Sequence, residues 1–179
     1  MTPGSAITPQ MRDAIGVESE PATHEVEKGA IRRFAEAIGD SNPLFHDEEA
    51  ARRSPFGRLV APPTFLRSLA PGPPRAPFAI PYDGLLDGGS EWEYFGPVRA
   101  GDRITVTTTV SDIFERRGRL GNMLFITRQT RYVDQSGKTA AVQRNTLIHY
   151  PTGVQRGASA GSTSGSGPAP GRSGGRSAP

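Results

Sequence analysis

The feature that most constrains this chain is a set of long segments between residues 91 and 150 in which apolar and polar side chains alternate. Such alternation, in segments rich in Val, Ile, Thr and aromatic residues, is typical of β-strands. The segments are separated by GPVRAG, ERRGRLG and DQSG, which are typical turn sequences. The sequence therefore predicts an antiparallel sheet with four strands, at Glu91 to Phe95, Asp102 to Phe114, Met123 to Tyr132 and Lys138 to Tyr150.

The chain before residue 81 has helical periodicity instead. Ile31, Phe34, Ala35 and Ile38 follow the spacing of one helix face, which predicts an amphipathic helix over residues 28–38. Two shorter helices are predicted over residues 47–53 and 64–70, and the second of these is apolar and lies between proline pairs. The predicted class is α+β, with a sheet that wraps the short apolar helix.

Composition divides the chain into a body and a tail. Residues 151–179 include eight Gly, six Ser and four Pro, and their only charged side chains are three arginines. We expect this tail to be disordered, residues 1–10 to be mobile, and residues 11–150 to form one domain. The tail carries the whole formal net charge of +3, so the positive charge does not indicate nucleic-acid binding by the domain.

Several classes of protein are disfavoured by what the sequence lacks. The chain has no cysteine, which excludes disulfides, thiolate metal sites and a cysteine nucleophile. It shows neither metal-ligand spacing nor a glycine-rich phosphate loop, so we expect no metal and no cofactor. No apolar run approaches the roughly 18 residues of a membrane helix, and the first 16 residues do not resemble a signal peptide. We therefore expect a cytoplasmic protein with no membrane partner.

The densest polar cluster is DSNPLFHD, residues 40–47, directly after the amphipathic helix. The stretch FAEAIGDSNPLFHDEEAARRSPFGRLVAPPTF resembles the start of a MaoC-type hot-dog hydratase or dehydratase. Together with GVESEP, EWEYFGPVRAGDRITV and GNMLFITRQTRYVDQSGKTAAVQRNTLIHY, it is similar to the branch related to the N-terminal dehydratase domain of fungal-type fatty-acid synthases. The resemblance covers about residues 11–150.

This resemblance implies a hot-dog fold, in which a curved antiparallel sheet wraps a central helix. It also implies reversible addition of water to a 2-enoyl thioester, carried by CoA or an acyl carrier, to give the (R)-3-hydroxyacyl thioester. That chemistry uses a water held between a carboxylate and an imidazole, with a backbone N–H that polarises the thioester carbonyl.

Carried over by position, the resemblance implies a catalytic carboxylate at Asp40. The family pattern Asp-x-Asn-Pro-Leu-His-x-Asp puts its histidine where this chain has Phe45, and His46 stands one place later. At the start of the central helix the family has a His-Gly or similar pair, whereas this chain has two prolines that cannot donate an N–H. The candidate catalytic residues are Asp40 and His46, and the candidate substrate-binding residues are Asn42, Phe45, Pro63 and Thr64.

Purely structural roles remain open for the same residues. Asp40 could cap the turn after the first helix, and His46 could be the N-cap of the next. Tyr94 and Phe95 are expected in the core rather than in a substrate pocket. The three arginines at residues 116, 117 and 119 are expected to be a solvated turn rather than a contact for the phosphates of CoA or an acyl carrier.

Three hypotheses for the function follow. In the first, the chain is a hydratase or dehydratase subunit paired with a second MaoC-like chain, because hot-dog pairs bury the sheet edge and build the acyl tunnel between protomers. In the second, it is an active homodimer that uses Asp40 and His46. In the third, it is a non-catalytic subunit that binds acyl thioesters or serves as a scaffold, and its partner supplies the catalytic histidine. A hot-dog thioesterase is disfavoured, because nothing singles out its carboxylate placement.

Overall fold

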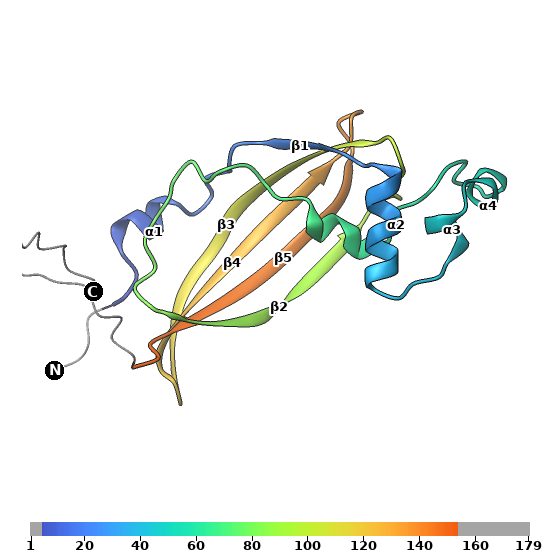
Figure 1. Ribbon diagram of the computed structural model, residues 1–179. Coiled ribbons are helices and arrows are strands. Elements are labelled where there is room, and N and C mark those ends of the chain that lie inside the picture. The colour runs from blue at the N-terminus through green and yellow to red at the C-terminus, as the bar shows by residue number, and fades with distance from the viewer. Residues whose placement is uncertain (1–4, 154–179) are drawn as a thin grey trace, which may run out of the picture.

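The computed structural model describes residues 5–153, which form a curved five-stranded antiparallel sheet with helices at both of its ends (Figure 1). The strand order is β1-β3-β4-β5-β2, so β1 and β2 are the two edges. This confirms the antiparallel sheet predicted from the alternating segments. The strands are β1 (Ala22–Glu25), β2 (Gly84–Tyr94), β3 (Arg103–Gly118), β4 (Gly121–Val133) and β5 (Thr139–Tyr150).

Strands β3, β4 and β5 begin and end within a few residues of their predicted bounds, whereas the edge strands do not. Strand β2 begins at Gly84, seven residues before the predicted start, and contains a bulge between Asp87 and Ser90. Gly89 has φ +107° in this bulge, a conformation that glycine adopts readily. The sequence did not predict β1, which has only four residues and is held by pairing with β3.

The helices agree with prediction where the apolar spacing is regular. Helix α2 (Lys28–Ala37) and helix α4 (Glu48–Arg53) match the predicted helices closely, whereas α3 (Pro43–His46) and α1 (Pro9–Asp13) were not predicted. Within α2, Ile31 and Ala35 are buried and Phe34 is partly buried, while Ile38 lies just beyond the helix and is 50% exposed.

The N-terminal segment from residue 5 onward makes contacts with the rest of the fold. The Ala6 N–H donates to the Glu115 carboxylate on β3, and Thr8 caps α1 (Pro9–Asp13), while the expected mobility of residues 1–10 stays a prediction. Residues 1–4 and 154–179 lie outside the described residues, so the predicted disordered tail remains a prediction beyond Gly153, as does the domain boundary at residue 150.

The element that packs inside the curve of the sheet is the 3₁₀-helix η1 (Pro63–Ser68), not an α-helix over residues 64–70. Pro62 and Pro63 supply no N–H groups at its start, and a proline-rich segment follows it, so no longer helix can form. Phe65 and Leu66 of η1 are buried in the same cluster as Val106 and Tyr132 of the sheet. Figure 1 shows η1 beside α2 at one end of the sheet.

The chain then runs from residue 69 to residue 83 with no regular secondary structure, and we call this segment the strap. Backbone and side-chain bonds hold it against the N-terminal part of the chain. His24 bonds to the Ala70 carbonyl at 2.7 Å, and the Glu20 N–H donates to the Pro73 carbonyl at 2.9 Å. Arg75 donates two hydrogen bonds to the Glu20 carboxylate, at 2.7 and 3.0 Å.

Two further properties concern membranes and metals. No helix within residues 5–153 is both long and apolar enough to cross a bilayer. Over the same residues, no three His, Asp or Glu side chains gather in a way that could hold a metal ion.

Candidate functional site

The polar cluster at residues 40–47 is a compact chain reversal between α2 and α4. Gly39, with φ +70°, ends α2, and the Asp40 N–H donates back to the Ala35 carbonyl at 2.9 Å. The Asp40 carboxylate accepts the Asn42 N–H at 3.0 Å, and the Asn42 side chain accepts the Leu44 N–H at 3.0 Å as the N-cap of α3. Asp40 therefore has the turn-capping role that remained open, and the same turn orients its carboxylate.

Asp40 and His46 are brought together by this turn. His46 Nε2 lies 2.7 Å from the Asp40 backbone carbonyl oxygen, which can only accept, so Nε2 carries the proton of this bond. In the neutral imidazole, Nδ1 is then left as an acceptor. Both side chains line a shallow surface cavity of about 580 Å³, together with Glu36, Gly39 and neighbouring residues of the turn.

Ion pairs with α2 fix the position of this turn. Arg32 Nε donates to the His46 carbonyl at 3.1 Å, and the Arg32 guanidinium also bonds the Glu48 carboxylate at 3.1 Å. Lys28 bonds the other Glu48 oxygen at 2.5 Å, and this hydrogen bond is the main reason that the pKa of Glu48 lies below its usual value.

The N-cap of α4 is Asp47, not His46. Asp47 Oδ1 accepts the N–H groups of Glu49 and Ala50 at 2.8 and 3.1 Å, and these bonds lower the pKa of Asp47. The capping role considered for His46 is therefore wrong, because the carboxylate is directly before the helix and is the better acceptor.

Phe45 lines a different cavity from that of Asp40 and His46. It is buried in the core and lines an apolar cavity of about 510 Å³ that also includes Asn42, Pro63 and Leu66. Three of the predicted substrate-binding residues, Asn42, Phe45 and Pro63, thus meet at one cavity, whereas Asp40 and His46 line another. The two cavities share no lining residue, which the sequence alone did not reveal.

Thr64 lies in the first turn of η1, with an exposed side chain. It lines neither of these two cavities. The first N–H groups of a helix have no partner within the helix, so the Thr64 N–H has the character expected of a carbonyl-polarising donor. Its role stays a prediction.

Tyr94 and Phe95 are not core residues as expected. They are 43% and 57% exposed, and both line the apolar cavity beside Phe45. They lie at the end of β2, an edge strand, so no further strand covers them within the described residues. Burial raises the pKa of Tyr94, whose ring stacks on Trp92 with 5.6 Å between centroids.

The arginine-bearing hairpin lies far from this site. Figure 1 shows the β3–β4 hairpin at the opposite end of the sheet from α3. Arg116 lies over the rings of Phe114 and Phe125, at 5.1 and 5.7 Å from their centroids. Within one chain, these arginines therefore do not face the Asp40–His46 cavity.

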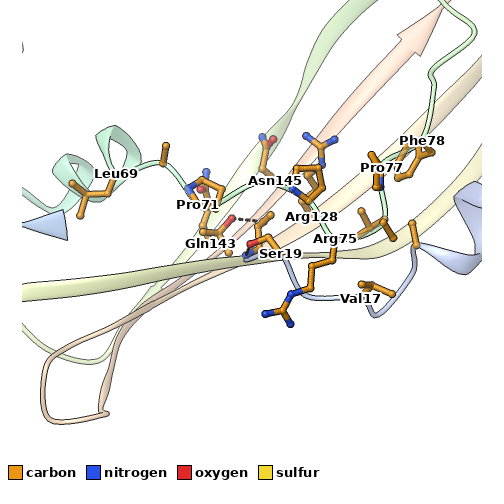
Figure 2. A pocket seen from close by; sticks show the side chains of 18 of the residues that line it. Val17, Ser19, Leu69, Pro71, Arg75, Pro77, Phe78, Arg128, Gln143 and Asn145 are labelled. Atoms are coloured by element: carbon orange, nitrogen blue, oxygen red, sulfur yellow. Dashed lines mark hydrogen bonds between the residues drawn. The ribbon is translucent and has the colours of Figure 1, made fainter. Parts of the chain in front are cut away.

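A third cavity, of about 570 Å³, lies between the strap and the concave face of the sheet (Figure 2) and was not predicted from the sequence. Its polar floor includes Arg128, Gln143 and Asn145. A signal was present in LFITRQTRYV, where Arg128 occupies an inward position between Ile126 and Tyr132.

Sequence comparisons agree with this architecture. A family model described as "FAS1-like, dehydratase domain region" matches residues 13–143. A UPF0336 protein of Streptomyces griseus is 36% identical over 133 residues, which are 65% of this chain and 89% of the relative. One from Streptomyces avermitilis is 40% identical over 50% of this chain, and the match spans 63% of that relative's length. A probable enoyl-CoA hydratase alpha subunit of Thermomonospora curvata is 33% identical over 67% of this chain and 43% of its own length.

Solved structures have the same fold. A MaoC-like dehydratase from Rhodospirillum rubrum superposes with a TM-score of 0.61 and 29% identity, covering 79% of this chain and 96% of its own. The HadBC (3R-hydroxyacyl-ACP dehydratase) complex of Mycobacterium tuberculosis matches with a TM-score of 0.60 and 22% identity, covering 76% of this chain and 97% of the matched chain. These likenesses confirm the predicted class, a curved antiparallel sheet of the hot-dog type.

Proposed function

Because this chain belongs to the family of FAS1-like dehydratase regions, whose fold is that of the MaoC-like hot-dog proteins, we propose that it is one subunit of an enzyme that reversibly hydrates 2-enoyl thioesters. The product would be the (R)-3-hydroxyacyl thioester of CoA or of an acyl carrier. The proposal needs no cofactor, since the reaction is an acid–base addition of water.

One observation leads us to propose a subunit that needs a partner, and not an enzyme that is active by itself. Phe45 stands at the family's histidine position and faces the apolar cavity, whereas His46 lines the separate shallow cavity. An acyl group bound beside Phe45 would therefore not meet the His46 imidazole. We infer that this chain contributes a wall of the acyl site, and that a second MaoC-like chain contributes the catalytic histidine.

The apolar cavity has the character that an acyl wall requires. Its lining is dominated by Phe45, Leu66, Tyr94 and Phe95 with their neighbours, and the Asn42 side-chain oxygen is already used in capping α3. Burying an acyl chain on such a surface contributes about 0.8 kcal/mol for each CH₂ group. Pro63 lines this cavity at the start of η1, and we propose that the N–H of the next residue, Thr64, donates to the thioester carbonyl.

The chemistry then divides between the two chains. The water oxygen bonds to C3 of the enoyl group, its proton goes to the partner's imidazole, and charge develops on the thioester oxygen. C2 then takes the proton from that imidazolium, which completes the addition of one water and restores the neutral imidazole. An N–H near that oxygen stabilises the charge more in the transition state than in the ground state.

A second candidate function, an active homodimer, is favoured by the Asp40–His46 contact. The bond from Nε2 to the Asp40 carbonyl fixes the ring and leaves Nδ1 free to accept a proton from water. The Asp40 carboxylate lines the same cavity and could hold that water.

A third candidate, a scaffold that binds thioesters without catalysis, shares the apolar cavity but requires no imidazole.

The test is hydration of crotonyl-CoA and of a longer 2-enoyl-CoA, followed by loss of enoyl absorbance. The purified chain is assayed alone and with a MaoC-like chain that carries the intact Asp-x-Asn-Pro-Leu-His pattern. We expect activity only with the partner. In the complex, His46→Ala should leave the rate within about twofold, and removal of the partner's histidine should lower it by roughly 10²–10⁴.

Each other outcome selects a different function. If the isolated chain is active and loses about 10²–10⁴ in rate with His46→Ala, the homodimer is correct and our proposal is wrong. If no combination hydrates the substrate but the chain binds a non-hydrolysable enoyl thioester, it is a binding subunit. Replacing Phe45 by His and His46 by Leu restores the family spacing and should give the isolated chain activity.

A further inference from the structure

The inward-facing side chains of β4 change from apolar to polar and back again. Leu124 and Ile126 are buried at one end of the strand and Tyr132 at the other, while Arg128 and Thr130 lie between them. Side chains two residues apart share one face of a strand, so all five point toward the concave side. The middle of this face therefore carries a charged group between two hydrophobic clusters.

Neighbouring strands extend this polar region across the sheet. Thr130 pairs with Thr108 on β3 and with Gln143 on β5, and Arg128 pairs with Asn145 on β5. We call Thr108, Arg128, Thr130, Gln143 and Asn145 the polar band. In a fold of this kind the concave face is packed by a helix, but η1 ends at Ser68 and does not cover the band.

The strap covers the polar band without filling the space above it. The cavity between them, about 570 Å³, is within the size range of about 300–1,000 Å³ that is common for small-molecule sites. Figure 2 shows Leu69 and Pro71 of the strap on one side of it and Pro77 and Phe78 on the other, with Arg128 and Asn145 of the sheet between them. The cavity thus has an apolar roof and a polar floor.

The charged side chains that line this cavity are all positive. Its lining includes three arginines and no Asp, Glu or Lys. Arg75 is neutralised by Glu20, and Arg67 lies 4.0 Å from the Asp87 carboxylate. Within residues 5–153, the structure gives the Arg128 guanidinium no hydrogen bond and no ion pair, and burial lowers its pKa.

The other members of the polar band already have hydrogen-bond partners. Thr108 and Thr130 bond to each other at 2.9 Å, and Gln143 accepts from the Tyr132 hydroxyl and donates to Ser90. The Asn145 amide donates to Gly89 and Ser90. Arg128 is thus the group in the band whose donors are unused, and a half-buried cation without a partner is costly to keep.

We propose that this cavity binds an organic anion, with a carboxylate on the Arg128 guanidinium and an apolar body beneath the strap. A guanidinium matches a carboxylate with two parallel hydrogen bonds, and the roof supplies the hydrophobic contact. The site goes beyond the hydratase function. It shares no lining residue with the cavity of Phe45.

The chain contains its own reporter for binding. Its single tryptophan, Trp92, stacks on Tyr132 with 5.6 Å between centroids, and Tyr132 lines the cavity. We would titrate the full chain with octanoate, with octanol as the uncharged analogue and with inorganic phosphate as the small anion, and follow tryptophan fluorescence. Octanoate should bind more tightly than either of the other two.

Arg128→Gln should weaken octanoate about 10- to 100-fold and leave octanol unchanged, because it removes a charge-assisted pair. The matched control is Arg131→Gln: Arg131 lies on the same strand but is exposed on the opposite face, and its replacement should change nothing. Equal binding of octanoate to wild type and Arg128→Gln would overturn the proposal, as would phosphate binding as tightly as octanoate.

A second measurement needs no variant, in case Arg128→Gln does not fold. In NMR spectra of the full chain, octanoate should shift the side-chain amide resonances of Gln143 and Asn145, since both line the cavity. The side-chain amide of Asn122, on the distant β3–β4 hairpin, is the internal control. Unchanged Gln143 and Asn145 resonances at saturating octanoate would contradict the site.

Discussion

Among single residues, His149 has the imidazole most altered by its surroundings. It is 8% exposed, and its Nε2 is buried with no hydrogen-bond partner among the described residues. Burial, with a smaller contribution from the positive charge of Arg128, lowers the pKa of His149 below its usual 6.5. The folded protein thus keeps this side chain neutral at a pH where an unfolded chain would begin to protonate it.

We therefore expect stability to decline as the pH falls below about 6.5, because the unfolded state then binds more protons than the folded state. His149→Gln should flatten this dependence between pH 7.5 and pH 5. The measurement is urea unfolding at several pH values, combined with an NMR titration of the His149 ring. A ring titration midpoint at or above 6.5 would contradict the assignment.

At the scale of secondary structure, the elements that could be predicted accurately are those with a long, regular pattern of apolar and polar residues. Strands β3 to β5 and helix α2 have long regular patterns, so their positions could be predicted from the residues alone. Strand β2 was predicted too short because Asp87, Gly88 and Gly89 resemble a loop. The structure includes them as a bulge, and a Cβ at Gly88 would lie only 2.8 Å from the Thr146 carbonyl oxygen.

The candidate site was predictable only in part, for a related reason. Local spacing was enough to bring Asp40 and His46 together, because only five residues of the turn and α3 separate them. The direction of Phe45 depends on α3, a four-residue helix that forms only with the Asn42 cap and core packing. The cavities depend on contacts between segments far apart in the sequence, which a local pattern does not contain.

The contact between α2 and η1 gives a prediction for these two elements. The Phe34 and Phe65 rings meet edge to face with 5.6 Å between centroids. Phe34→Ala should destabilise the protein by about 3 kcal/mol through the cavity that it leaves. Ile38→Ala, which removes an apolar side chain that is 50% exposed, should cost under about 1 kcal/mol. Chemical denaturation would measure both, and equal effects would show that the α2 face is assigned incorrectly.

At the scale of the whole molecule, the two sheet edges differ. Strand β1 has four residues, whereas β2 has 11 and carries exposed Leu85 and Leu86. A long apolar edge strand is prone to pair with another chain. We therefore expect the proposed subunit contact to include β2.

Leu85→Asp should release the chain from its complex with the MaoC-like partner in sedimentation experiments, because it places a charge on that edge. Ile38→Asp is the matched control, since Ile38 is similarly exposed at 50% but caps the end of α2 instead of lying on β2. If the wild type and both variants all sediment as the complex, the subunit contact does not include this part of β2.

The end of the domain can be located by two truncations. The Thr152 N–H donates to the Asp83 carboxylate at 2.9 Å, which ties the chain after β5 to the end of the strap. Removal of residues 154–179 should leave the melting temperature within about two degrees, because their Gly- and Ser-rich composition has no apolar face. Truncation after Tyr150 should lower it further. Calorimetry would measure the melting temperature of both truncated forms. A larger drop on removal of residues 154–179 than on truncation after Tyr150 would contradict a domain end between residues 150 and 153.

The strand order has a consequence for biosynthesis. Strand β1 pairs with β3, which follows it by roughly 80 residues, and β2 pairs with β5, the last strand to be translated. At about 5–20 residues per second, a ribosome needs roughly 4–16 s to add 80 residues. During that interval Ile31 and Phe65 have no sheet to cover them. The nascent N-terminal half is therefore a client for any chaperone that binds exposed hydrophobic segments, and cellular yield depends on that protection as well as on the stability of the finished fold.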